Sequence, residues 1–140
     1  MRRLAPLLGF TLLLAGCGGG GTVSPTAETV IGTVPTSTQS SVPAGDATAG
    51  TSLFKSNGCG GCHKFMPAGT NATIGPDLDK LAGYAKQANM GSLEQFTFDS
   101  IKNPSAYIQP GYEKAAPMPN FGQTLSDKQI ADLVAYLTKG

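Results

Sequence analysis

The amino-acid sequence predicts a small all-α domain. Two capping boxes, in which a serine precedes a glutamine by three positions, mark helix starts at residues 92–95 and 126–129. The second box is followed by an apolar stripe with i, i+3, i+4, i+7 spacing: Ile130, Leu133, Val134 and Leu137. The sequence has no alternating run of β-branched residues that would indicate a sheet. Its 140 residues suffice for one domain with a core but not for two.

The first 16 residues have the features of a secretory leader. Arg2 and Arg3 form a charged start, and the apolar run from Leu4 to Ala15 is too short to span a bilayer by itself. Two basic residues are common in leaders, so they do not by themselves indicate the twin-arginine export route. We therefore expect residues 1–16 to be a signal peptide.

The end of this leader, Leu14-Ala15-Gly16-Cys17, resembles the lipobox of bacterial lipoproteins, in which cleavage before the cysteine is followed by lipid attachment to it. The alternative is an ordinary cleavage site with an incidental cysteine, but an unpaired thiol in an exported protein favours lipidation. The resemblance implies that Cys17 anchors the mature chain to a bacterial membrane, on the periplasmic or extracytoplasmic side.

Residues 17–45 are predicted to form a flexible linker. From Gly18 to Ala44 the sequence consists mostly of Gly, Ser, Thr, Pro and Val, with Glu28 as the single acid and no helical apolar period. A flexible segment of this length has a root-mean-square span of roughly 30 Å, which would let a domain swing above the membrane. The folded domain is then expected to cover residues 46–140.

The folded domain is expected to begin with a helix. Asp46 can cap a helix that runs through Gly50 and Phe54, and Asn57-Gly58 can end it. A turn at residues 74–78 leads into a short apolar-periodic segment that comprises Leu78, Leu81, Ala82 and Ala85.

The helix that opens at Ser92 is expected to turn three apolar residues inward: Leu93, Phe96 and Ile101. Asn103-Pro104 closes this helix, because the residue before a proline avoids helical geometry. Residues 104–124 carry four prolines and no apolar period, so they are predicted to form an irregular loop before the last helix.

The motif Cys59-Gly60-Gly61-Cys62-His63 matches the pattern for covalent attachment of a c-type haem. On one tight helical turn the two thiols lie on the same face and can reach the two vinyl groups of one porphyrin edge. His63 then lies beneath the iron as an axial ligand. We therefore expect a single haem c, bound covalently through Cys59 and Cys62.

Other uses of this motif are weaker. A thiol–disulfide redox pair is usually found in a βαβ unit, which this sequence does not suggest. A structural zinc site needs four ligands, whereas the third cysteine lies far away in the leader and His63 is the only histidine. A disulfide between Cys59 and Cys62 would close a very small loop and add little stability.

The ligand on the second face of the iron decides between electron transfer and ligand chemistry. Met66 follows His63 so closely that it cannot easily reach the far face. Met90 can reach it from a loop–helix junction. Met118 is favoured, because the prolines on both sides of it limit the entropy lost in presenting its thioether. The alternative for Met118 is a core-filling role, although a proline-flanked loop is a poor place for one.

With these features the chain resembles a class I monohaem c-type cytochrome over residues 46–140. The resemblance extends to Gly75-Pro76-Asp77-Leu78 after the proximal ligand and to the distal Met118. Three further segments make the chain similar to cytochrome c domains associated with terminal oxidases: Asn103-Pro104-Ser105-Ala106-Tyr107-Ile108, Pro110-Gly111-Tyr112 and Met118-Pro119-Asn120-Phe121.

The resemblance implies a small cytochrome c fold in which the N- and C-terminal helices cross and loops wrap one haem. It implies that the Pro76 carbonyl accepts a hydrogen bond from the His63 ring. It also places Gly50 and Phe54 at the helix crossing, against Leu133 and Tyr136. The chain lacks the tryptophan that many members place beside a haem propionate. Tyr107 or Tyr112 is expected in that role, with simple aromatic packing as the alternative.

The formal net charge of +1 gives no footprint for nucleic acid. The sequence shows no acid–base pair or nucleophile arrangement, so we expect an electron carrier rather than an enzyme. Its partners would be redox proteins, with a terminal oxidase as one candidate, in a respiratory or related chain. The alternatives are a redox enzyme or gas sensor with an open distal site, a fixed subunit of an oxidase or reductase complex, and a haem-free thiol or metal-binding module.

Overall fold

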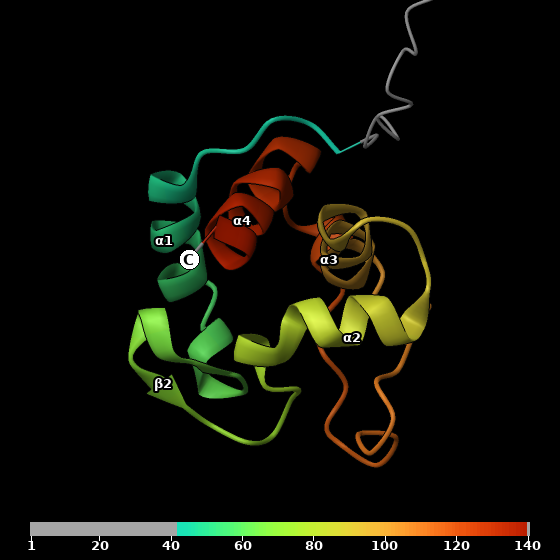
Figure 1. The fold of residues 1–140 in the computed structure, drawn as a ribbon. Helices are drawn as coiled ribbons and strands as arrows, with labels where there is room; N and C mark the ends of the chain where they lie inside the picture. The colour runs from blue at the N-terminus through green and yellow to red at the C-terminus, as the bar shows by residue number, and fades with distance from the viewer. Residues whose placement is uncertain (1–41, 140) are drawn as a thin grey trace, which may run out of the picture. The chain divides into compact units, whose positions relative to one another are not determined.

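The computed structural model describes residues 42–139, which form four α-helices, two very short strands and several 3-10 turns (Figure 1). The α-helices are α1 (Ala47–Ser56), α2 (Leu81–Ala88), α3 (Leu93–Lys102) and α4 (Asp127–Lys139). The strands β1 (Lys64–Phe65) and β2 (Thr70–Asn71) pair antiparallel, with Lys64 opposite Asn71 and Phe65 opposite Thr70. The 3-10 turns are η1 (Cys59–Gly61), η2 (Met66–Ala68), η3 (Leu78–Lys80) and η4 (Phe121–Gln123). The predicted all-α fold is confirmed.

The predictions for the signal peptide, for Cys17 and for the linker up to residue 41 lie outside the described residues. Within residues 42–139, no helix has the length and apolar character needed to cross a bilayer.

Helix α1 begins and ends where its capping residues predict. The Asp46 carboxylate accepts hydrogen bonds from the backbone N–H groups of Thr48 and Ala49, at 2.7 and 3.2 Å. The helix ends at Ser56 with Asn57 as its C-cap, and Gly58 follows with a φ of 67°, a left-handed conformation that glycine adopts without strain. The last turn of α1 therefore leads directly into the Cys59–His63 motif.

Helices α1 and α4 pack against each other, as the resemblance implied (Figure 1). The contact is close because Gly50 has no side chain: a Cβ atom there would lie 2.1 Å from the Asp132 carbonyl oxygen and 2.7 Å from the Tyr136 Cβ. Phe54, Phe65 and Tyr136 form an aromatic cluster beside this crossing, with ring centroids 5.3 to 5.7 Å apart. Phe54 also belongs to the same buried core as Leu133.

Packing begins four residues before the predicted domain start at Asp46. Val42 is partly buried against the main core. The Gly45 backbone lies against α4, where a Cβ atom would come within 1.9 Å of the Ala131 carbonyl oxygen. The end of the predicted linker is therefore part of the folded structure.

The inward faces of α2 and α3 differ in part from the predicted ones. Leu81 and Ala85 are buried, whereas Ala82 is exposed. Helix α2 packs only one face against α3, and Tyr84 rather than Ala82 lies on that face. In α3 the predicted Phe96 and Ile101 are buried and Leu93 is partly buried. Thr97 and Phe98 are also buried, since α3 contacts both α2 and α4. A helix covered on two sides has no single apolar stripe to read from the sequence.

Candidate functional site

A cavity of about 410 Å³ opens between the Cys59–His63 segment, helix α3 and the long loop before α4. This volume falls within the usual range of ligand-binding pockets. Its walls include every predicted site residue that the structure describes: Cys59, Cys62, His63, Pro76, Tyr107, Tyr112 and Met118. Residues far apart in the sequence thus meet around one space.

The two cysteines of the motif lie on a single tight turn. The backbone N–H groups of Cys62 and His63 both donate to the Cys59 carbonyl, at 3.2 and 3.0 Å. Both thiols are free; Cys59 is half-buried and Cys62 is exposed. Burial raises the pKa of the Cys59 thiol; a backbone hydrogen bond opposes part of this rise, and the nearby Cys62 adds a smaller one. Neither sulfur is used in another bond, so both are available to a group in the cavity.

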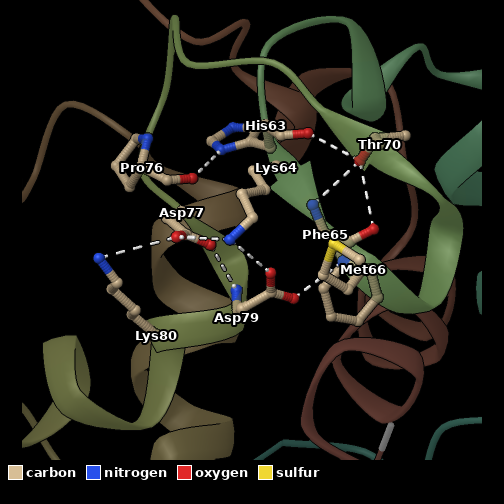
Figure 2. Close-up of polar contacts among 9 residues, drawn as sticks. All are labelled: His63, Lys64, Phe65, Met66, Thr70, Pro76, Asp77, Asp79 and Lys80. Atoms are coloured by element: carbon tan, nitrogen blue, oxygen red, sulfur yellow. Dashed lines mark hydrogen bonds and ion pairs between the residues drawn. The ribbon is translucent and has the colours of Figure 1, made fainter.

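His63 is oriented by a hydrogen bond from its ring to the backbone. The imidazole is only 9% exposed, and its Nδ1 lies 2.8 Å from the Pro76 carbonyl oxygen (Figure 2). A carbonyl can only accept a hydrogen bond, so Nδ1 carries the proton, and in the neutral ring Nε2 then keeps a free lone pair. This is the tautomer of a histidine that binds a metal through Nε2.

A charged cluster lies beside this hydrogen bond (Figure 2). The Lys64 ammonium donates to the carboxylates of Asp79 and Asp77, and these two contacts raise the pKa of Lys64. Partial burial tends to raise the pKa of Asp77, but the bonds from Lys64 and from the Asp79 N–H outweigh it and lower that pKa. Neither Lys64 nor Asp79 was predicted to belong to the site, and Asp77 was named only as part of the segment Gly75-Pro76-Asp77-Leu78.

The structure brings one of the three candidate methionines to the cavity. Met118 is half-buried, packs against the main core and lines the cavity wall. Met66 is 63% exposed and Met90 is 41% exposed, and neither lines the cavity. Met118 is thus the methionine whose thioether can reach a group bound there.

Two tyrosines predicted to contact a cofactor also line the cavity. The Tyr107 ring packs edge-on against Phe96, with centroids 5.5 Å apart and an interplanar angle of 75°. Tyr112 is half-buried in the long loop. The wall therefore contains both residues, and Tyr107 also has the packing role that was its alternative.

Gln109 is a cavity residue that the sequence analysis missed. Its side chain is 8% exposed, and its Nε2 donates to Gln87 Oε1 at 2.9 Å. Among the described residues, its Oε1 is the one buried side-chain polar atom without a hydrogen-bond partner. A buried amide in an irregular loop has no periodicity signal, so the sequence alone could not have revealed it.

These residues fit a c-type haem. Two free thiols lie on one turn, an imidazole with a free Nε2 follows them, and a thioether lines the same cavity. The unpartnered Gln109 oxygen marks a point where a bound group with polar substituents, or ordered water, would complete the wall.

Comparisons with known proteins agree with this chemistry. The family model described as Cytochrome c matches residues 47–140. The chain is 34% identical over 112 residues to a cytochrome c from Tetrahymena pyriformis, an alignment that covers 74% of this chain and 96% of that protein. It is 32% identical over 108 residues to a cytochrome c from Guizotia abyssinica, which covers 68% of this chain and 90% of that protein.

Proposed function

The chain belongs to the cytochrome c family, whose cofactor is covalently bound haem c, and on this premise we propose that it is a membrane-tethered electron carrier. In this proposal Cys59 and Cys62 would hold one haem, and His63 and Met118 would bind its iron. The electron passes in a respiratory or related chain between redox partner proteins, with a terminal oxidase as one candidate acceptor.

The observation that carries the proposal is the meeting of these four side chains at one cavity. His63 and Met118 are separated by 55 positions in the sequence, yet both line it. A carrier needs both axial positions filled, because a filled site keeps dioxygen and peroxide off the metal. The structure contains one histidine and one half-buried thioether at this cavity, which is the set that such a site requires.

When bound, haem c supplies one-electron redox chemistry at its iron. The chain's own residues hold and tune it. The Pro76 carbonyl keeps the His63 proton on Nδ1, which leaves Nε2 to the metal and raises ligand basicity. The Met118 thioether would favour the ferrous form relative to a nitrogen ligand, and the apolar wall would do the same by excluding water. A positive reduction potential follows from both effects.

The decisive experiment is expression in a bacterial host that attaches haem to exported proteins. A denaturing gel stained for covalent haem should show a stained band for the natural chain and none for a Cys59→Ala, Cys62→Ala double variant. An unstained natural band would overturn the haem assignment.

A spectrum of the oxidised protein tests the ligand set. The carrier should be low-spin and show the sulfur-to-iron charge-transfer band. A high-spin spectrum would instead support a redox enzyme or gas sensor with an open distal site.

The tether is proposed from the sequence, because residues 1–41 lie outside the described part. Residues 1–16 would be removed on export and Cys17 would carry lipid, with residues 17–45 as the linker to the domain. Metabolic labelling with a radioactive fatty acid should label the natural chain, and Cys17→Ala should abolish the label. An unlabelled natural chain would contradict the lipid anchor.

The mobile carrier and the fixed subunit are separated by purification from native membranes. A mobile carrier should be recovered alone at high salt. Co-migration with a large complex under those conditions would favour a subunit of an oxidase or reductase.

A further inference from the structure

Two segments of the chain run side by side next to the His63 ring with a constant offset. In four contacts a residue of the 62–66 segment meets the residue 13 positions further along, and three of these contacts involve side chains. The four pairs are Cys62 with Gly75, His63 with Pro76, Lys64 with Asp77, and Met66 with Asp79. The His63–Pro76 hydrogen bond is therefore one contact in a series, and the Lys64 ion pair is the next.

Lys64 joins the two segments at their centre. Its Nζ lies 3.3 Å from Asp77 Oδ2 and 3.2 Å from Asp79 Oδ2, so one ammonium bridges two carboxylates (Figure 2). Its side chain is 36% exposed, whereas that of Lys80, which approaches Asp77 only to 3.8 Å, is 69% exposed. The Lys64 contacts are thus the inner part of the cluster.

The two carboxylates are themselves held by the backbone. Asp77 Oδ1 accepts from the Asp79 N–H at 3.1 Å, and Asp79 Oδ1 accepts from the Met66 N–H at 2.9 Å. Each acid therefore uses one oxygen for the backbone and the other for Lys64. Held in this way, the carboxylates offer Lys64 a preorganised site, unlike a pair of free surface side chains.

The backbone of His63 is anchored separately from its ring. The Thr70 hydroxyl donates to the His63 carbonyl at 2.9 Å and accepts from the Phe65 N–H at 3.0 Å. On the other segment, Pro76 has the Gly75–Cys62 hydrogen bond before it and the Asp77–Lys64 ion pair after it. On the C-terminal side of Pro76, the Lys64 ion pair is therefore the contact between side chains that links Asp77 to the segment of His63.

We propose that Lys64 is a positioning residue for His63: its ammonium, shared by Asp77 and Asp79, holds the Pro76 carbonyl in hydrogen-bonding distance of His63 Nδ1. The inference rests on the proposed function, since its importance comes from His63 being the axial ligand. A hydrogen bond to Nδ1 makes the imidazole a stronger electron donor, which favours the oxidised iron. A looser Pro76 carbonyl should therefore raise the reduction potential.

The effect of a looser Pro76 carbonyl on the reduction potential can be separated from the direct electrostatic effect of the Lys64, Asp77 and Asp79 charges. Removing the Lys64 charge would lower the potential by electrostatics alone, because a nearby positive charge favours the reduced iron. Removing the two acid charges would raise it by the same reasoning. If the cluster positions the carbonyl, both changes loosen the same hydrogen bond, and both raise the potential.

The test compares Lys64→Gln with the double variant Asp77→Asn, Asp79→Asn. Asparagine keeps an Oδ1 acceptor for the Asp79 and Met66 N–H groups, so the double variant removes only the ion pairs. The control is Lys80→Gln, which removes a charge from the outer side of the same cluster. The rescue is Lys64→Arg, whose guanidinium can bridge two carboxylates.

Two measurements are made on the haem-loaded proteins. Because His63 is the only histidine, ¹⁵N-histidine labelling gives NMR signals from this one ring. The Nδ1 proton should exchange faster with solvent in Lys64→Gln and in the double Asn variant, and at the natural rate in Lys80→Gln and Lys64→Arg. The midpoint potential should rise both in Lys64→Gln and in the double Asn variant.

Potentials that move in opposite directions, with natural exchange rates in both variants, would overturn the inference and leave a purely electrostatic effect. Far-UV circular dichroism checks that each variant is folded. If the glutamine variant is not, the Nδ1 exchange rate of the double asparagine variant keeps the test decisive, because a purely electrostatic effect would leave that rate unchanged. Failure of the proposed function is seen separately, since the natural chain would then lack a covalent haem or a low-spin spectrum.

Discussion

The backbone of Gly75 lies against the imidazole ring of His63: a Cβ atom at this position would be 2.6 Å from the ring Cε1 and 2.9 Å from Nδ1. Its φ is outside the left-handed region, so the backbone conformation does not require glycine. Glycine is required at position 75 only because a Cβ atom would overlap the His63 ring. Gly75 allows the ring to reach the carbonyl of the following residue, Pro76, at 2.8 Å.

Gly75→Ala should therefore push the ring away from Pro76. The overlap and the lost hydrogen bond together should lower the free energy of unfolding by about 2 to 4 kcal/mol, measured by guanidinium titration. Covalent haem staining should persist, because Cys59 and Cys62 are on another segment. Unchanged stability would mean that the segment around residue 75 moves aside without cost.

The crossing of α1 and α4 gives a second prediction. Gly50→Ala would place its Cβ 2.1 Å from the Asp132 carbonyl oxygen, which belongs to rigid helix backbone. The helices must then separate, and we expect a loss of about 3 kcal/mol in the free energy of unfolding.

Gly83→Ala in α2 is the matched control for Gly50→Ala. Apart from its chain neighbours and the backbone of its own helix, a Cβ atom there has no atom within 4 Å, so the substitution should stabilise the helix by about 0.5 to 1 kcal/mol. If the two variants had equal stability, close packing at Gly50 would not be what limits this position.

A third prediction concerns acid. The buried Asp132 carboxylate accepts a hydrogen bond from the Asp46 N–H at 2.6 Å, which joins α4 to the start of α1. The same carboxylate pairs with Lys128 one turn earlier in α4. Burial tends to raise the pKa of Asp132, but the Lys128 ammonium and the Asp46 N–H outweigh it and hold the pKa below its ordinary value. A lowered pKa in the folded state stabilises the fold above the unfolded pKa, and this stabilisation is lost as the pH falls through the folded pKa.

Asp132→Asn should therefore cost about 1 to 2 kcal/mol at pH 7, and the difference from the natural chain should shrink below about pH 4. Urea unfolding of both proteins at several pH values measures this difference in the free energy of unfolding. Asp127→Asn is the control: it removes an exposed pair with Lys102 and should cost at most about 1 kcal/mol. A difference that is independent of pH would contradict the role given to the Asp132 charge.

The fourth prediction concerns the distal ligand. Met118→Ala should abolish the sulfur-to-iron charge-transfer band and give a high-spin oxidised spectrum, because the thioether that lines the cavity is removed. Met66→Ala and Met90→Ala are matched controls that should keep the band, since both side chains lie away from the cavity. Loss of the band in Met90→Ala instead would transfer the ligand role to that residue.

Much of the fold could be predicted because helix ends depend on local chemistry. Ser126 and Gln129 exchange hydrogen bonds across the first turn of α4, and Asp46 caps α1 in the same local way. The exposed Ala82 and the buried Phe98 were not predicted, because their burial depends on which neighbouring helices cover each face. The short β1–β2 pair was also beyond prediction, since two residues in each strand carry no periodicity.

The attachment motif, the helix boundaries and the short list of candidate ligands could be predicted from the sequence, because each of these depends on residues within a few positions of one another. Three features needed the folded chain: Met118 rather than Met90 lines the cavity, Gln109 is buried in its wall, and Lys64 bridges two acids beside His63. These contacts join residues 13 or more positions apart. Such pairs are set by how the loops pack on the helices, and neither spacing nor composition records that packing.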